Sequence, residues 1–205
     1  MKQDQTTPLS STVEPLLAWY GQYRRSLPWR DAPTPYHVWL SEIMLQQTRI
    51  EAVIPYYERF LAAYPTVAQL AAADDERLMK LWEGLGYYSR ARNLKRAAKQ
   101  VVEQYGGELP ADYTALRALP GIGAYTAGAI ASIAFGLPEP AVDGNVLRVV
   151  TRLTADERDI MKESTKKGVT EALRAVYPTE PAEAAAMTQA LMELGERVCI
   201  PSGEP

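Results

Sequence analysis

The spacing of apolar residues is helical along nearly the whole chain, and this feature most restricts the possible fold. Two long segments show it clearly, with apolar positions recurring on one helix face: Ile50, Val53, Ile54, Tyr57, Phe60 and Leu61 in the first, and Leu94, Ala98, Val101, Val102 and Tyr105 in the second. No segment alternates strictly between apolar and polar residues with hairpin turns, as paired strands would. The pattern therefore predicts an all-α fold of about ten helices with short connections.

Capping residues and helix breakers predict where several of these helices begin and end. Three starts are marked: Thr34 before Pro35, Thr66 three residues before Gln69, and Thr179 before the Ala-rich segment 181–197. Glycines and prolines predict four stops, at Tyr64-Pro65, Gly106-Gly107, Gly136-Leu137-Pro138 and Tyr177-Pro178.

Length and composition indicate an intracellular globular protein. The 205 residues, 47% of them hydrophobic, are enough for a substantial core. The single cysteine, Cys199, rules out an internal disulfide framework and suggests a reducing compartment. No apolar run approaches the roughly 18 residues needed to span a bilayer. Residues 1–11 are polar and lack the apolar core of a secretory signal, so we expect a disordered N-terminal tail there and a cytoplasmic protein.

Charge is distributed unevenly along the chain. The net charge of −3, taken globally, argues against a nucleic-acid-binding protein. From Arg77 to Lys99, however, seven basic residues accompany one acidic residue, Glu83. This segment, which includes Arg90 and Arg92, is either a solvated helix face or a surface that binds phosphates. Two tyrosines in its turn at 84–88 favour nucleic acid, because aromatic rings stack on bases or wedge between them.

The most informative local pattern is the run Leu-Pro-Gly-Ile-Gly-Ala-Tyr-Thr-Ala at 119–127. Its two glycines allow positive φ and close approach of the backbone to a ligand. The free N–H groups and the positive dipole end of the following helix would then bind a phosphate without any basic side chain. An ordinary turn between packed helices is the alternative. The full run resembles the helix-hairpin-helix motif of DNA repair proteins, in which the middle apolar residue, here Ile122, is anchored in the core.

Glu42 lies in a segment that is otherwise strongly apolar. On a helix, its neighbours one turn away are Val38, Trp39 and Leu45. A carboxyl in such surroundings is expected to have a raised pKa and to hold a proton for general-acid catalysis. The alternative is an exposed acid at the edge of an apolar face.

Asp143 lies just before a helical pattern that starts at Val146, which predicts a helix N-cap. The helix dipole would keep the carboxylate ionised there, so it could also stabilise a cation that develops in front of it. A protonated acid and an ionised carboxylate are the groups needed to break a glycosidic bond. Together with a clamp for the DNA backbone, they suggest a base glycosylase, which must first take its target base out of the stack.

Five segments together resemble adenine DNA glycosylases of the MutY type, over roughly residues 12–199. They are residues 27–30 (LPWR), 39–48 (WLSEIMLQQT), 84–94 (GLGYYSRARNL), the hairpin at 119–127 and 142–146 (VDGNV). The resemblance implies a helix-hairpin-helix glycosylase fold with two helical lobes and the active site in the cleft between them. The lobes would be residues 12–28 plus 140–205, and residues 29–139 with the helix-hairpin-helix at 113–135.

The resemblance also implies roles for single residues. Glu42 would protonate adenine at N7 and later help to activate water, and Asp143 would stabilise the cationic sugar. Tyr125 and Asn145 would position these groups, and Trp29 and Arg30 would line the adenine pocket. DNA would be contacted by Gln46, Gln47 and Tyr87 at the mispair, by Gly121, Ile122, Gly123 and Thr126 of the hairpin, and by Arg90 and Arg92. A monovalent cation at the hairpin is also compatible with the family.

The implied substrate is duplex DNA with adenine opposite 8-oxoguanine or guanine, bound by a monomer near the nucleoid of a bacterial cell. Related glycosylase–lyases carry a lysine where this chain has Tyr125, so we expect a monofunctional enzyme that leaves the strand intact. Two other hypotheses remain open: a G·T mismatch thymine glycosylase, and a DNA-binding module without catalysis.

The family closes this domain with four cysteines that bind a [4Fe–4S] cluster. Cys199 matches the first of them, and the other three are absent from this chain. Because the chain stops at Pro205, just before the position at which the second cysteine would fall, we expect a longer natural protein that carries the cluster. The alternative is a natural form without the cluster.

Overall fold

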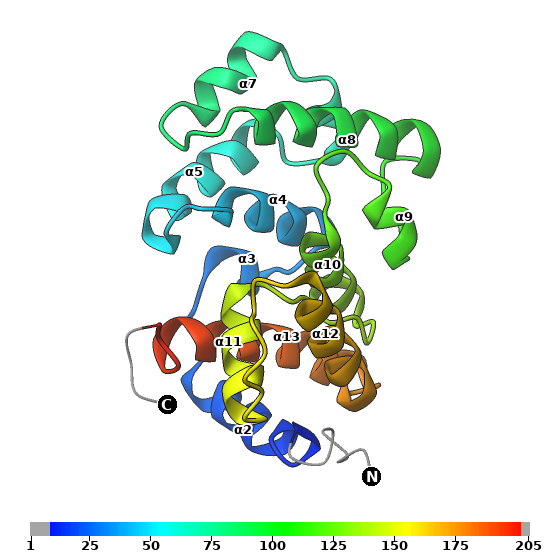
Figure 1. The fold of residues 1–205 in the computed structure, drawn as a ribbon. Coiled ribbons are helices and arrows are strands. Elements are labelled where there is room, and N and C mark those ends of the chain that lie inside the picture. The colour runs from blue at the N-terminus through cyan, green and yellow to red at the C-terminus, as the bar shows by residue number, and fades with distance from the viewer. Residues whose placement is uncertain (1–8, 202–205) are drawn as a thin grey trace. The chain divides into compact units, whose positions relative to one another are not determined.

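The computed structural model describes residues 9–201 and is helical throughout (Figure 1). Within these residues it contains twelve labelled helices, α2 to α13, and no strand, which confirms the predicted all-α class. The number exceeds the predicted ten because α3 (Pro28–Asp31), α6 (Val67–Ala71) and α9 (Tyr113–Arg117) have only four or five residues. Such short helices span little more than one turn, so they leave little periodicity in the sequence. No helix in the described range is long and apolar enough to cross a membrane.

Most of the predicted helix boundaries are confirmed. Thr34 caps α4 (Pro35–Leu45), and its hydroxyl accepts a hydrogen bond from the backbone N–H of His37 at 3.2 Å. Thr66 caps α6 in the same way. Helices α5 (Ile50–Ala63), α8 (Ser89–Tyr105) and α12 (Glu163–Val176) end directly before the predicted stops. Helix α13 (Pro181–Arg197) has the predicted bounds, but its N-cap is Glu180 and not Thr179.

The chain divides into two compact units. The terminal unit comprises the residues up to Arg25 and from Ala131 onward, and the other, the 26–130 unit, comprises Ser26–Ile130. The second division falls inside α10 (Ala124–Phe135), nine residues before the boundary expected from the sequence at 139/140.

The 26–130 unit contains α3 to α9 and the first part of α10 (Figure 1). Helix α8 packs against α4, α6 and α7 (Asp75–Trp82), and α4 also packs against α3 and α5. The largest buried side chains of this unit are aromatic: Trp39, Tyr57, Phe60 and Trp82. Because α4 has neighbours on several sides, nearly all of its side chains are buried, including Glu42.

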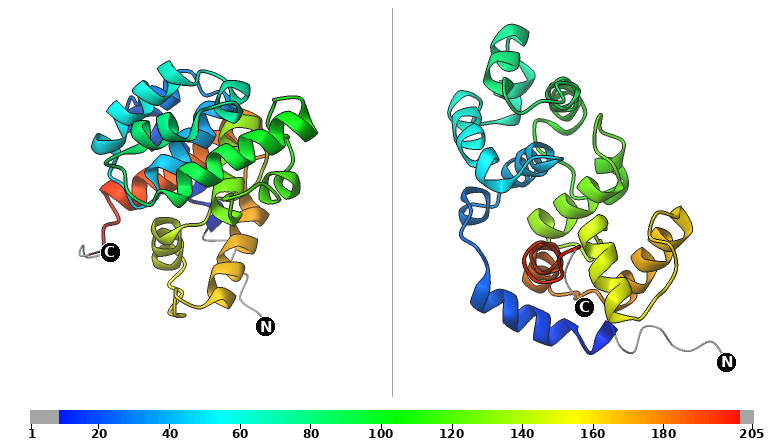
Figure 2. Two further views of the ribbon diagram at one scale, coloured as in Figure 1. Left: turned by 90° about the horizontal axis from the view of Figure 1, so that it is seen from above. Right: turned by 60° about the vertical axis from the view of Figure 1, so that its left-hand side comes forward.

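The terminal unit contains α2 (Val13–Tyr23), the end of α10, α11 (Gly144–Leu153), α12 and α13. Helix α13 lies between α2 and α11 (Figure 2, right). Leu9 is fully buried in the core of this unit, so the prediction of a disordered tail over residues 1–11 is wrong at this position. Residues 1–8 of that predicted tail lie outside the described residues.

Candidate functional site

Helix α4 buries the Glu42 side chain. The side chain is 6% exposed, and its helical neighbours Val38 and Trp39 are buried. The end of α4 is linked to the start of α10, because the side-chain amide of Gln46 donates to the Thr126 hydroxyl at 3.4 Å. Burial makes the charged form of a carboxyl less favourable, so a buried carboxyl can hold the proton that general-acid catalysis needs.

Trp29 and Arg30 lie on α3, which packs against α4. The Trp29 ring is buried and meets the ring of Tyr57 edge to face, with 5.3 Å between ring centroids. Arg30 is half-buried. Burial raises the pKa of the Tyr57 phenol above its ordinary value. The two residues predicted for an adenine pocket thus belong to the same unit as Glu42, on the helix next to α4.

The hairpin between α9 and α10 presents its glycines and buries the residue between them. Gly121 and Gly123 are exposed, whereas Ile122 is 5% exposed. Gly121 has φ +78°, and a Cβ atom there would lie 2.8 Å from the Cβ of Asn93 on α8. Glycine is therefore required at this position by both backbone conformation and space.

Two residues at the start of α10 differ in their exposure. Tyr125 is half-buried, but Thr126 is only 2% exposed and its hydroxyl accepts from Gln46. We therefore expect any contact of Thr126 with DNA to come from its backbone, because its side chain is directed into the protein.

Two exposed loop residues of the 26–130 unit have left-handed backbones although neither is glycine; a third such residue, Ala155, lies in the terminal unit. Gln47, between α4 and α5, has φ +58°, and Tyr87, between α7 and α8, has φ +46°. The Tyr87 side chain is 61% exposed. Left-handed conformations at residues with a Cβ are rare and often mark functional sites. Both residues are among those predicted to act at a mispair.

Arg90 is buried, and the prediction that it binds DNA phosphates is wrong. Its side chain is 8% exposed, and its guanidinium donates to backbone carbonyl oxygens, among them those of Met44 at 3.0 Å, Gln46 at 2.6 Å and Leu85 at 2.9 Å. Desolvation lowers the pKa of this arginine from its ordinary value. The Arg90 guanidinium therefore binds backbone carbonyl oxygens inside the protein instead of phosphates outside it.

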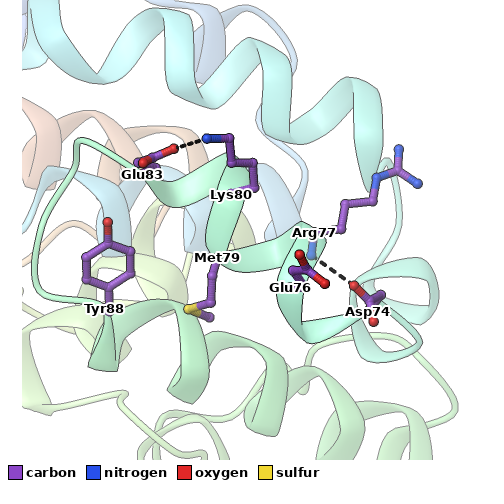
Figure 3. Close-up of a pocket in the computed structure, with 7 residues that line it drawn as sticks. All are labelled: Asp74, Glu76, Arg77, Met79, Lys80, Glu83 and Tyr88. Carbon is purple, nitrogen blue, oxygen red and sulfur yellow. Dashed lines mark hydrogen bonds and ion pairs between the residues drawn. The ribbon is translucent and has the colours of Figure 1, made fainter.

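The basic segment from Arg77 to Lys99 is partly neutralised by acidic residues around it. Lys80, near the end of α7, is paired with Glu83 (Figure 3), and 2.5 Å separates the ammonium nitrogen from the carboxylate oxygen. Lys95 of α8 is paired with Asp75, and this pairing lowers the pKa of the Asp75 carboxyl. Three of the four remaining cations line a pocket of about 310 Å³ beside α7, together with Lys95: Arg92, Arg96 and Lys99. The surface available to phosphates is therefore smaller than the sequence suggests.

Asp143 is the N-cap of α11, as predicted. One carboxylate oxygen accepts from the backbone N–H of Val146 at 2.8 Å, and the other accepts from the side-chain amide of Asn145 at 3.2 Å. The amide oxygen of Asn145 in turn accepts from Arg148 at 2.8 Å. The structure thus brings Asp143 and Asn145 together.

Arg148 and Gly195 are two contributors that the sequence reasoning missed. Arg148 also donates to the carbonyl oxygens of Cys199 at 2.7 Å and Gly195 at 2.6 Å, so it ties the end of α13 to Asn145. A Cβ at Gly195 would lie 2.7 Å from the Cβ of Asn145, which makes glycine necessary where α13 meets α11. The signal for Arg148 was present in its position three residues after Asn145, which places both on one helix face.

The residues of this chain do not fit a [4Fe–4S] cluster. Cys199 is the single cysteine, and its sulfur accepts from Arg152 at 3.3 Å. Within residues 9–201, no group of three or more histidine, cysteine, aspartate or glutamate side chains is placed to hold a metal ion. A cluster therefore has no part in the chemistry proposed for this chain.

Comparison with known proteins identifies the family. Residues 40–178 match the family described as "HhH-GPD superfamily base excision DNA repair protein". The chain belongs to this superfamily. Within it, the chain is 45% identical over 196 residues to the adenine DNA glycosylase of Rattus norvegicus. That alignment covers 91% of the chain and 37% of the rat protein, so the chain spans little more than a third of that relative.

Solved structures of this superfamily share the fold. A thermostable thymine-DNA glycosylase superimposes with a TM-score of 0.83 at 26% identity, covering 95% of this chain and 89% of that one. An endonuclease III trapped covalently on DNA superimposes with a TM-score of 0.79 at 24% identity, covering 97% and 89% of the two chains. The helix-hairpin-helix glycosylase fold predicted from the sequence is thereby confirmed.

Proposed function

We propose that this HhH-GPD chain carries the catalytic apparatus of a monofunctional adenine DNA glycosylase that acts on adenine opposite 8-oxoguanine or guanine. The observation that carries the proposal is the buried Glu42 carboxyl on α4, in the same compact unit as the exposed Gly121–Gly123 hairpin. One group suits protonation of a base, and the other suits the DNA backbone. The 45% identity to the rat adenine DNA glycosylase, in an alignment that covers 91% of the chain, supports the same reaction.

In the proposed reaction, a monomer binds the DNA backbone through the N–H groups of the hairpin, and the deoxyadenosine leaves the base stack. Glu42 donates its proton to adenine N7. The C1′–N9 bond breaks, and its electron pair leaves with adenine, so that an oxocarbenium-like sugar remains. Water then adds to C1′ and gives its proton to the Glu42 carboxylate, which restores the acid and yields an abasic site.

Asp143 would stabilise the positive charge on the sugar, because a carboxylate at a helix N-terminus is held as an anion. Its two hydrogen bonds, from Val146 and Asn145, fix its orientation. Tyr125 and Asn145 would position the reacting groups, Trp29 and Arg30 would line the base pocket, and Gln47 and Tyr87 would act at the mispair. The proposed partner is therefore duplex DNA, with room for a monovalent cation at the hairpin.

The proposed enzyme leaves the DNA strand intact. Strand cleavage by related glycosylases uses a lysine amine that forms a Schiff base with the sugar. This chain has Tyr125 at the corresponding position and no lysine between residues 119 and 127.

The test is incubation of the protein with duplexes that contain a single A·8-oxoguanine, A·G or G·T pair, followed by treatment with or without alkali. We expect nicks at adenine in the first two duplexes, only after alkali, and no adduct after borohydride. Release of thymine from G·T in place of adenine would favour a thymine glycosylase, the candidate that the structural likeness to a thymine-DNA glycosylase supports. Binding without any base release would favour a non-catalytic module.

A further inference from the structure

Arg90 connects two loops that are far apart in the sequence. On one side its guanidinium donates to the carbonyl oxygens of Ile43, Met44 and Gln46, at the C-terminal end of α4, at 2.9, 3.0 and 2.6 Å. On the other side it donates to the carbonyl oxygens of Leu85 and Gly86, in the turn before α8, at 2.9 and 3.3 Å. One buried side chain thus connects the start of the α4–α5 loop with the α7–α8 loop.

Each of these loops contains an exposed residue whose backbone has the unfavourable left-handed conformation. Gln47 directly follows one carbonyl that Arg90 holds, and Tyr87 directly follows another. Left-handed conformations at residues with a Cβ persist only where the surrounding contacts enforce them. Arg90 supplies such contacts to both loops at once, and its guanidinium carbon also lies 5.6 Å from the centroid of the Tyr87 ring.

Arginine suits this position better than lysine would. A guanidinium is planar and offers five N–H donors in fixed directions, so it can serve two sets of carbonyl groups simultaneously. A lysine ammonium offers three donors around one point and cannot reach both sets with the same geometry. The negative end of the α4 dipole further favours a cation there.

We propose that Arg90 is a positioning residue that holds the Gln47 and Tyr87 loops at a fixed spacing, so that both enter the duplex together at a mispair. This inference rests on the proposed function. It replaces the expected contact of Arg90 with phosphate by a contribution to recognition of the mispair. Loss of Arg90 should therefore affect unstacking of bases and should leave phosphate binding nearly unchanged.

The first experiment measures amide hydrogen exchange in the protein without DNA. In Arg90→Lys we expect the amide exchange rates to rise by about tenfold in both residues 46–48 and residues 84–88. A rise of this size corresponds to the net loss of one hydrogen bond in each loop. The control is Gly86→Ala, because Gly86 has φ +69° and a Cβ there would meet no atom within 4 Å, so the backbone strain is confined to the α7–α8 loop. That variant should loosen residues 84–88 only.

Equal loosening of both loops in Gly86→Ala would overturn the inference, since the unit would then open as a whole. This outcome remains measurable even if Arg90→Lys fails to fold. Exchange that rises in only one loop of Arg90→Lys would overturn it as well.

The second experiment uses a duplex with 2-aminopurine next to an A·8-oxoguanine pair, whose fluorescence rises when bases unstack. For Arg90→Lys we expect about tenfold weaker preference for this duplex over a matched one and a smaller fluorescence rise, with an unchanged salt dependence of binding. Arg92→Gln, which alters an exposed residue on the same helix, should reduce the salt dependence and keep the fluorescence rise. If wild-type protein shows no rise at the mispair, the proposed function fails, whereas a full rise in Arg90→Lys contradicts only the inference about Arg90.

Discussion

At the start of α11, one side chain has a structural and a proposed catalytic role. Asp143 caps the helix, and asparagine is an equally good N-cap. Asp143→Asn should therefore change the free energy of unfolding by less than about 0.5 kcal/mol while lowering the rate of adenine release by about 10²–10³-fold, because the anion is lost. Thermal unfolding and single-turnover kinetics would measure the two effects.

The control for this prediction is Asp143→Ala, which removes both the cap and the charge. We expect it to lose activity to a similar extent and also to lose about 1 kcal/mol of stability. An Asp143→Asn protein with wild-type activity would show that Asp143 is a cap only.

Single residues differ in how well the sequence predicts their positions. Asp143 was predictable as a cap because its partner, Val146, lies three residues away in the chain. Arg90 was not, because its carbonyl partners at the end of α4 lie 44 to 47 residues away and the next basic residue along the chain, Arg92, is exposed. A local pattern of charge cannot reveal which cation the fold buries.

At the scale of elements, the hairpin between α9 and α10 offers a matched pair of glycines. Gly121 has φ +78° and no space for a Cβ, whereas a Cβ at Gly123 would meet no atom within 4 Å and φ there is not positive. Gly121→Ala should cost about 1–2 kcal/mol of stability from the backbone conformation alone and should weaken DNA binding. Gly123→Ala should be tolerated in stability measurements.

Equal effects of the two substitutions on unfolding and on duplex binding would contradict this account of the hairpin. The sequence predicted the hairpin well because its glycines and the buried Ile122 are contiguous. Periodicity did not reveal α3, α6 and α9, since helices of four or five residues span little more than one turn, and α6 was predicted only from its cap, Thr66.

For the whole molecule, the net charge of −3 conceals a local basic surface on α8. If Arg92, Arg96 and Lys99 contact phosphates, replacing each by glutamine should reduce the slope of log binding constant against log salt by about 0.9. Lys80→Gln should leave the slope unchanged, because Lys80 is already paired with Glu83. Fluorescence anisotropy over a series of salt concentrations measures these slopes, and unaltered slopes in all three α8 variants would remove α8 from the DNA interface.

The helical class and most helix boundaries were predictable because they depend on local periodicity and capping. The division of the chain into units was less so, because α10 continues unbroken through the second boundary. Contacts between distant segments decide such a division, and periodicity along one helix carries no information about them.

The proposed reaction depends above all on the Glu42 carboxyl, which supplies the proton that releases adenine. The most direct test compares wild type with Glu42→Gln, which has nearly the same size and no acidic proton to give, by counting alkali-labile sites in a duplex with one A·8-oxoguanine pair. We expect wild type to produce these sites, and the variant to bind the duplex with similar affinity but to produce none above background. Wild-type rates of adenine release in Glu42→Gln would contradict this role for Glu42.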